Sequence, residues 1–560
     1  MQRSTGTFLI AFNAVLMAGA SASAQVRDAS DGKWREQSSA RTGLESVEND
    51  EAAMPVPIVV RPDAQDPAPA SEALDIAEGI RIGSVLIEAP DVIDHALFEK
   101  SIEPFLGAEA GPEDLARLTQ EIADVARAQG LVLATAYIPP QDVELGIVRV
   151  VLMIGVIDEV RILGSQNQAL KDLLQPLVGE AVIQRELERR LMLASDIPSI
   201  SAKQAEFITE DGRYILVVTV EERKKTSGQF VADNSGSKAI GPLRGRMTLN
   251  TIGWLTASDA LSATVQTNPS DTDELLSASL AYGFGLNNQG TRAGATIAAS
   301  RSKLRSSYDF SRQDITSQYV SMVVNHPLRR LRGSSAWLEG QIEYLEFEQE
   351  REGALLVSDT VVTLSTSLSS LKRTGNGWLR SGLQLRRGLD TPGSSQPGSA
   401  LSSRYDASGE FTSARAWINW SASPSDDWAW RLWMTGQYTD DPLLLTEEIG
   451  FGGTGFGRGF EPYTFTGDRG ILALAELGYA YDKPADWLGR LEPYAFVDYG
   501  YLDQIGDGLG GDRAMSGGGG VRAEIGRVGV QLETAVPVFQ DVWREAKDEP
   551  KLNFQLGLDF

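Results

Sequence analysis

The chain has no cysteine in 560 residues and only two histidines, His95 and His326. The lack of cysteine excludes disulfide frameworks, thiolate zinc sites and cysteine nucleophiles. The two histidines fall in different expected domains, and neither has the spacing of a metal site or a catalytic triad. No pair of carboxylates is singled out by its position either. The sequence therefore gives no positive indication of an enzyme, a metal site or a cofactor.

Basic residues are also scarce, with 51 Lys and Arg against 76 Asp and Glu, which gives a net charge of -25. Nucleic-acid binding needs a concentrated positive surface, so this class of partner is excluded. Residues 450–455 formally fit the glycine spacing of a dinucleotide-binding loop. That spacing works only between a strand and a helix N-terminus, and no helix is expected after it.

Long apolar runs are scarce as well. The clearest one covers residues 8–18, follows Arg3, and is followed by small residues at 22–24. This pattern predicts a signal peptide over residues 1–24. The alternative is an uncleaved anchor, but a membrane-spanning helix needs about 20 apolar residues. Residues 25–79 are polar and then rich in proline, which predicts a short N-terminal helix followed by an extended linker.

Residues 80–222 contain an internal repeat of a strand-helix-helix-strand-strand unit. The same short motif recurs at residues 102–107 and 174–179. In both it consists of an apolar residue, a polar residue, proline, two apolar residues and glycine. We expect two α+β domains, at 80–155 and 156–222, with a chance pairing of unrelated modules as the alternative. The expected strands are 80–88, 131–138, 147–154, 156–163, 203–208 and 213–220, and the expected helical regions are 95–106, 112–128, 168–174 and 184–194.

Residues 223–560 alternate apolar and polar side chains in short segments separated by Gly, Asn, Asp and Ser. Membrane barrels alternate in this way, and because the apolar and polar residues average out, the mean hydropathy of -0.17 is compatible with a barrel. An even number of segments suits a closed antiparallel barrel, whereas a soluble secreted sandwich, which also alternates, is the alternative. The sixteen segments lie near Gln229, Met247, Ala263, Ala278, Ala295, Val320, Trp337, Val362, Leu379, Trp417, Trp433, Ala473, Phe496, Val521, Leu532 and Gln555.

A glycine-rich loop at residues 451–468 is best explained as a segment that folds back into a barrel lumen. Arg458 at its tip would need a carboxylate partner in that confined space. Asp498 is a candidate, because strand alternation places it on the same face as Gly500, pointing inward. The alternative is a solvated surface loop and an unrelated aspartate.

The repeat, the barrel and the loop together resemble the transporters of two-partner secretion (TpsB proteins), the haemolysin and filamentous haemagglutinin secretion/activation proteins. These belong with the BamA-like barrels that carry POTRA domains, and the resemblance covers nearly all of the mature chain. Gly457-Arg458-Gly459-Phe460 looks like the family's V-R-G-[YF] loop tip, and residues 496–500 fit its [FG]-x-D-x-G strand motif. The resemblance implies an ion pair between Arg458 and Asp498. Gly457 replaces the usual valine, which we expect to loosen the packing of the loop.

The resemblance implies a 16-stranded transmembrane antiparallel β-barrel in the Gram-negative outer membrane, preceded by two periplasmic α+β POTRA domains. These would capture an unfolded, TpsA-like exoprotein by adding its strand to a sheet edge. The candidate edge contains Leu131, Leu133, Thr135 and Tyr137. The N-terminal segment resembles the family's plug helix in length and position, and the loop at 451–468 would block the resting pore. Phe560 would be part of the signal that the barrel-insertion machinery reads.

Two other functions compete with a secretion transporter. The first is a factor that inserts proteins into the outer membrane, and the second is a passive porin. Two POTRA domains and a plug segment favour secretion over assembly, and the periplasmic repeats disfavour a porin. The expected partners are the exoprotein, outer-membrane lipid and lipopolysaccharide. The transporter itself is expected to be monomeric and to need no cofactor. Without a nucleotide site, the free energy for export would come from folding of the passenger outside the cell.

Overall fold

The computed structural model of the chain describes residues 58–60, 80–89, 93–143, 145–305, 312–425, 427–506, 511–542 and 549–560. The expected signal peptide, residues 1–24, and nearly all of the expected plug helix and linker, residues 25–79, lie outside these ranges. No helix within them is long and apolar enough to cross a membrane. The chain forms two compact units, one built on Pro55–Arg223 and the other on Lys224–Arg329 and Gly333–Phe560.

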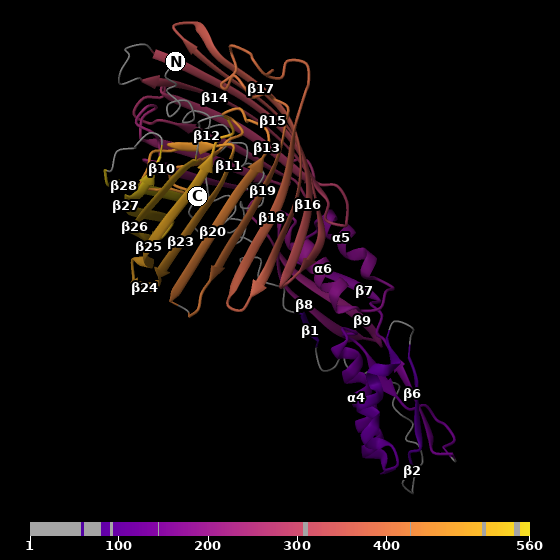
Figure 1. Cartoon of the computed structure of the whole chain (residues 1–560). Helices are drawn as coiled ribbons and strands as arrows, with labels where there is room; N and C mark the ends of the chain where they lie inside the picture. The colour runs from indigo at the N-terminus through magenta and orange to yellow at the C-terminus, as the bar shows by residue number, and fades with distance from the viewer. Residues whose placement is uncertain are drawn as a thin grey trace. The chain divides into compact units, whose positions relative to one another are not determined.

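The first unit contains the expected repeat, coloured indigo to magenta in Figure 1. In the first repeat β3, β6 and β5 form a sheet in that order, and in the second repeat the order is β1-β8-β9-β7. The first repeat has β2 (Ile80–Arg81), β3 (Ser84–Glu88), η2 (His95–Phe98), α3 (Glu99–Ile102), η3 (Glu103–Phe105), β4 (Glu109–Ala110), α4 (Pro112–Ala128), β5 (Thr135–Tyr137) and β6 (Ile147–Met153). The second has β7 (Glu159–Leu163), α5 (Gln168–Leu174), η4 (Gln175–Leu177), α6 (Gln184–Ser195), β8 (Ile200–Glu210) and β9 (Arg213–Glu222).

Helix α4 covers the expected residues because its ends are specified locally. Pro112 occupies the first turn, where its missing N–H costs no hydrogen bond. The Asp114 carboxylate accepts a hydrogen bond from the Gly111 N–H at 3.1 Å. Leu118 and Ile122 face the core with no exposed area. At the other end, Gly130 adopts a φ of 94°, which favours glycine and ends the helix.

The strand expected at 131–138 is shorter than predicted, since β5 covers only Thr135–Tyr137. Leu131 is buried in the core of the first repeat, and Leu133 is buried in the core of the second. Their backbones are also occupied, because the Gly155 N–H donates to the Leu133 carbonyl at 3.3 Å and Leu131 forms a β-bridge with Ile183. These two residues therefore join the repeats and do not form part of a free edge. Thr135 and Tyr137 do lie in an edge strand.

A strand that the sequence did not predict lies in the proline-rich segment. Ile58–Val60 forms β1 and pairs in parallel with β8, from Ile58 opposite Ala205 to Val60 opposite Phe207. It thereby occupies an edge of the second repeat's sheet. Three residues carry too little local pattern to be recognised as a strand from sequence.

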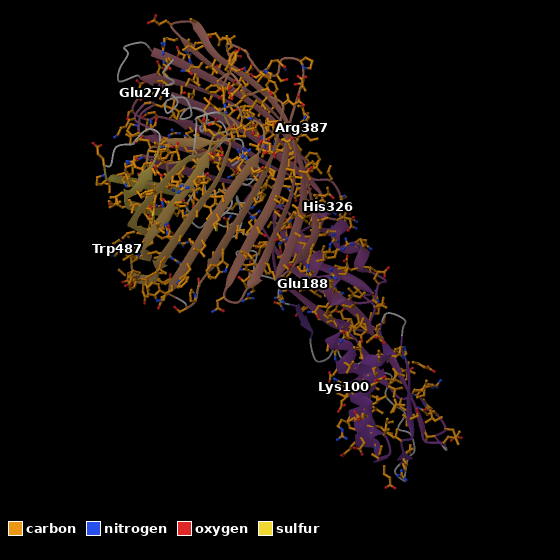
Figure 2. The ribbon with its side chains drawn as sticks, in the orientation of Figure 1. Lys100, Glu188, Glu274, His326, Arg387 and Trp487 are labelled. Atoms are coloured by element: carbon orange, nitrogen blue, oxygen red, sulfur yellow. The ribbon has the colours of Figure 1, made fainter. Side chains whose placement is uncertain are left out.

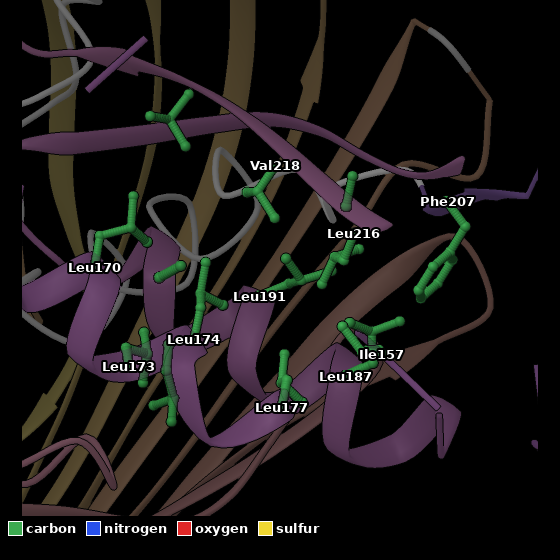
Figure 3. Close-up of a cluster of buried hydrophobic side chains, with 14 of the residues drawn as sticks. Ile157, Leu170, Leu173, Leu174, Leu177, Leu187, Leu191, Phe207, Leu216 and Val218 are labelled. Atoms are coloured by element: carbon green, nitrogen blue, oxygen red, sulfur yellow. The ribbon is translucent and has the colours of Figure 1, made fainter. Parts of the chain in front are cut away.

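Figure 3 shows how the second repeat buries its apolar side chains between the helices and the sheet. Leu174 from α5 and Leu191 from α6 lie in one cluster with Phe207 from β8 and Leu216 from β9. Asn167 caps α5, because its side chain accepts a hydrogen bond from the Leu170 N–H at 3.1 Å. The repeat therefore has a core of its own.

Phe207→Ala is expected to destabilise this repeat by about 3–5 kcal/mol, because it empties a fully buried aromatic site. Resistance of the first unit to protease in the full-length protein, followed against urea concentration, would measure the loss. Phe207→Leu is the control and should cost less than about 1.5 kcal/mol. Equal resistance of the alanine variant and the unaltered protein would contradict the assignment of this core.

The second unit is a closed antiparallel β-barrel, and each of the sixteen expected segments lies in one of its strands. β23 and β24 both pair with β25 and form one continuous wall strand. The wall strands are β10 (Thr226–Asp233), β11 (Arg244–Ile252), β12 (Ala260–Thr267), β13 (Leu275–Gly285), β14 (Arg292–Arg305), β15 (Arg312–Leu331), β16 (Ser334–Arg351), β17 (Ala354–Thr374), β18 (Gly377–Leu389), β19 (Phe411–Ala422), β20 (Trp428–Thr439), β23 (Arg469–Tyr479), β24 (Tyr481–Ala485), β25 (Leu488–Asp503), β26 (Gly511–Ile525), β27 (Val528–Asp541) and β28 (Lys551–Asp559).

The alternation of the sequence gives the barrel two chemically different faces. In β13, for example, Leu276 and Leu280 are exposed on the outside, whereas Ser277 and Ser279 are buried on the inside. Aromatic side chains also lie near strand ends, such as Trp487 in the turn between β24 and β25, labelled in Figure 2 and 66% exposed. An apolar outer face with aromatic residues at its border is the pattern of a membrane barrel and not of a soluble sandwich.

The barrel closes between β10 and β28, from Gln229 opposite Asp559 to Asp233 opposite Gln555. Phe560 extends this seam, because its N–H and carbonyl exchange hydrogen bonds with Gly228 at 2.9 and 3.0 Å. A Cβ atom on Gly228 would lie 2.3 Å from the Phe560 ring, so the glycine makes room for that ring.

Gly228→Val is expected to destabilise the seam by about 1–3 kcal/mol through overpacking. The temperature at which the folded band of the purified barrel disappears in a detergent gel would fall accordingly. The double variant Gly228→Val/Phe560→Ala removes the clash and should recover part of the loss. A double variant that is additively worse would show that the ring does not occupy this position.

Candidate functional site

The candidate site lies in the lumen loop, which we define as residues 440–468 between β20 and β23. The loop contains a small hairpin of β21 (Ile449–Phe451) and β22 (Phe465–Gly467). Beyond the hairpin the chain turns tightly, because the Phe460 N–H donates to the Gly457 carbonyl at 2.9 Å. This turn places Arg458 at the tip with only 1% of its surface exposed. The loop therefore carries a charged side chain into a buried environment.

Arg458 and Asp498 form a multidentate contact. The Arg458 guanidinium donates to both carboxylate oxygens of Asp498, at 3.1 and 3.3 Å. The backbone N–H groups of Gly457 and Arg458 donate to the same carboxylate at 3.2 and 2.9 Å, and the Ser516 hydroxyl donates to it at 3.1 Å. Asp498 has no exposed surface. The Asp498 carboxylate thus binds both the loop backbone and the Arg458 guanidinium.

Two further carboxylates, which sequence analysis missed, contact the same guanidinium. Nη1 of Arg458 lies 3.0 Å from Glu476 on β23 and 2.9 Å from Glu533 on β27. The guanidinium also lies over the Phe496 ring, 3.3 Å from its centroid, which favours a cation. Alternation in the segment near Leu532 would have placed Glu533 inside the barrel, whereas residues 471–475 are all apolar and do not orient Glu476. No motif or spacing distinguishes these two glutamates from the other carboxylates.

A second layer of charges surrounds this contact. Arg431 and Arg522 each bind both Glu476 and Glu492, at distances between 2.7 and 3.0 Å. We call Arg458 and these residues the tip cluster, with members Arg431, Arg458, Arg522, Glu476, Glu492, Asp498 and Glu533. Each carboxylate in the cluster faces at least one arginine. Such a network holds a fixed geometry, because removal of one member leaves a buried charge without its partner.

Close steric contact also fixes the loop tip. A Cβ atom on Gly459 would lie 2.7 Å from the Val536 backbone, so the tip is pressed against the barrel wall. A Cβ on Gly500 would lie 2.6 Å from the Phe451 ring, which shows that Gly500 makes room for an aromatic side chain of the loop. Phe451 packs in turn against Phe460, with ring centroids 5.8 Å apart.

Gly457 does not loosen the packing, contrary to the expectation from the sequence. Its φ of 84° lies in the left-handed region, which valine rarely adopts. A Cβ atom there would lie 2.7 Å from the Phe451 ring and 2.8 Å from the Gly452 nitrogen. The departure from the usual valine is therefore required by the local backbone of this chain.

The remaining residues considered from the sequence contribute no side chain to the tip cluster. Thr135 and Tyr137 belong to the first unit, and Phe560 lies at the barrel seam. The glycine pattern at 450–455 begins in β21, and no helix follows it among the described residues. Within the same ranges, no group of His, Asp and Glu side chains is arranged to hold a metal ion.

Comparisons with known proteins agree with this architecture. Residues 212–523 match the family described as haemolysin secretion/activation protein ShlB/FhaC/HecB, and residues 80–155 match a POTRA domain of the ShlB type. The heme/hemopexin transporter protein HuxB of Haemophilus influenzae strain 86-028NP is 22% identical over 414 residues, which cover 71% of this chain and 72% of that protein.

Solved structures share the fold. CdiB from Escherichia coli superimposes with a TM-score of 0.77 at 17% identity, over 97% of this chain and 99% of that chain. CdiB from Acinetobacter baumannii gives a TM-score of 0.68 at 15% identity, over the full length of both chains. At these low identities the structural likeness shows a shared fold alone.

Proposed function

Because this chain belongs to the family of haemolysin secretion/activation proteins, we propose that its tip cluster serves the export of a partner exoprotein by two-partner secretion. The chain is an outer-membrane transporter with POTRA domains in the periplasm. The observation that carries the proposed role of the site is the burial of Arg458 among Asp498, Glu476 and Glu533. A fixed loop inside a protein-conducting barrel controls the space through which a passenger moves.

The exoprotein enters this scheme as an unfolded chain in the periplasm. Thr135 and Tyr137 lie in β5, at one edge of the first repeat's sheet, where an extended segment can add as a further strand. In this proposal the two POTRA domains cover residues 80–155 and 156–222, and the barrel covers residues 223–560. With no nucleotide step, folding of the passenger outside makes export irreversible.

Deletion of the gene tests the proposed function. A secretion transporter is expected to leave one large exoprotein stranded in the periplasm, while the other outer-membrane proteins keep their normal amounts. A general loss of outer-membrane barrels would indicate an assembly factor instead. Unaltered secretion of every exoprotein would overturn the proposal.

The docking edge has a separate test. Pro has no N–H to donate and is poorly tolerated in a paired strand. Ala136→Pro in β5 is therefore expected to reduce binding of the unfolded exoprotein by about twofold to tenfold, as one lost hydrogen bond of about 0.5–1.5 kcal/mol would produce. Pull-down of the denatured exoprotein by the purified transporter measures this change. Pro139→Ala, just beyond the strand, is the control, and equal binding by both variants would exclude β5 as the docking edge.

A further inference from the structure

We propose that Glu447 is a second anchor of the lumen loop, held by arginines on a different arc of the barrel wall from the tip cluster. The proposal rests on the proposed secretion function and extends it, because it assigns a positioning role to residues outside the loop motif. The anchor lies in the leading limb of the loop, which we define as residues 440–448.

Glu447 is 4% exposed and is bound by two wall arginines. Arg386 on β18 donates to its carboxylate at 3.2 Å. Arg415 on β19 donates to its backbone carbonyl at 3.1 Å and lies 3.6 Å from its carboxylate. Arg386 is itself paired with Glu343 on β16 at 2.6 Å. The four side chains form a cluster whose formal charges cancel only when Glu447 is ionised.

Gln437 on β20 joins the leading limb to the other end of the loop. Its amide donates to the Glu447 carbonyl at 2.9 Å and to the Asp468 carbonyl at 3.0 Å. Its own carbonyl oxygen accepts a hydrogen bond from Arg415 at 2.5 Å. The Asp468 carboxylate is also bound at 2.7 Å by Arg404, which lies in the connection between β18 and β19. Both ends of the loop are therefore fixed to the wall and to each other.

The two anchors have opposite polarity. At the tip the loop supplies a cation to wall carboxylates, whereas at the leading limb it supplies an anion to wall arginines. The loop's ends at β20 and β23 and the tip contact leave the path of the leading limb open, whereas a further attachment at Glu447 defines it. Loss of Glu447 would leave Arg386 and Arg415 facing one carboxylate, Glu343, so a buried positive charge would lack its partner.

Apolar packing alone could also hold the leading limb, since Leu443 and Leu444 are fully buried against Val361, Ala407 and Phe411. Glu447→Gln separates the two causes. It keeps the volume and the backbone hydrogen bonds but removes the charge that the arginines require. An effect of this variant would therefore be electrostatic.

The absence of cysteine from the natural chain allows single-cysteine reporters. Thr446→Cys reports on the leading limb, where its buried hydroxyl has no hydrogen-bond partner to lose. Ala514→Cys reports on the tip, because Ala514 is 2% exposed and lies in one buried cluster with Phe451 and Phe460 of the loop. A membrane-impermeant maleimide added to intact cells labels either cysteine only when the loop has moved away.

Glu447→Gln is expected to raise labelling of Thr446→Cys by about tenfold and to reduce secretion by a similar factor, as the loss of a buried ionic contact predicts. Glu447→Asp should fall between it and the unaltered protein. Glu461→Gln is the matched control, because Glu461 is in the same loop but 34% exposed in its pair with Lys551, so both readouts should stay unchanged.

Unchanged labelling in Glu447→Gln would overturn the anchor. Increased labelling with normal secretion would overturn its positioning role. Arg458→Ala, measured in the same cells, separates these results from a failure of the proposed function. If that variant also secretes normally, the tip contact is not needed for secretion, whereas the labelling still decides whether Glu447 holds the leading limb.

Discussion

Arg458→Ala is expected to reduce secretion of the partner exoprotein by more than about tenfold while the barrel still inserts. Breaking a buried ion pair costs about 3–5 kcal/mol, because the remaining charges lose their partner. Here Asp498, Glu476 and Glu533 would be left facing one another without the guanidinium that they share. The exoprotein in the culture medium, divided by the amount of folded transporter, measures the effect.

Arg458→Lys is the informative control for this variant. Lysine keeps the charge but is a compact cation without the planar fork that donates to several carboxylates at once. We expect it to restore only part of the secretion. Both variants should still give the folded band of an inserted barrel in detergent gels. Full secretion by Arg458→Ala would remove the tip cluster from the mechanism.

Gly457→Val is expected to impair secretion although valine is usual at this position in the family that the motif resembles. Valine at a φ of 84° is strained by about 1–3 kcal/mol. Its side chain would also overlap the Phe451 ring and the Gly452 backbone, which adds about 1–3 kcal/mol of overpacking. Labelling of Ala514→Cys would show whether the tip has left the wall.

Gly340→Val provides the matched control for this substitution. Gly340 lies in a wall strand, and a Cβ atom added there meets nothing within 4 Å. It should leave secretion and labelling unchanged. Normal secretion by Gly457→Val would mean that the loop adopts another backbone path without loss of function.

The barrel and the repeat could be predicted from the sequence because short-range patterns of apolar, polar and helix-ending residues specify their elements. Alternation with a period of two located each of the sixteen wall strands, and the ends of α4 are specified by Pro112 and Gly130. The contact between Arg458 and Asp498 was accessible because a motif marked one partner and strand alternation oriented the other.

The rest of the site depends on distances that no local pattern contains. Arg458 meets Glu533 across 75 residues, and only the register of the intervening strands brings them together. The positive φ of Gly457 and its close approach to Phe451 are also tertiary features that the motif does not show. Leu133 was assigned to a free edge because its alternation fits a strand, but tertiary contacts use it to join the two repeats.

A double-mutant cycle between Arg458 and Asp498 tests the central claim most directly, which is that these side chains act together to hold the loop for secretion. Asp498→Ala alone should be milder than Arg458→Ala, because Glu476 and Glu533 still neutralise the arginine. The double variant should secrete more than the product of the two single losses predicts, since either single variant already breaks the ion pair. Two losses that multiply in the double variant would show that the residues act independently and would contradict this account.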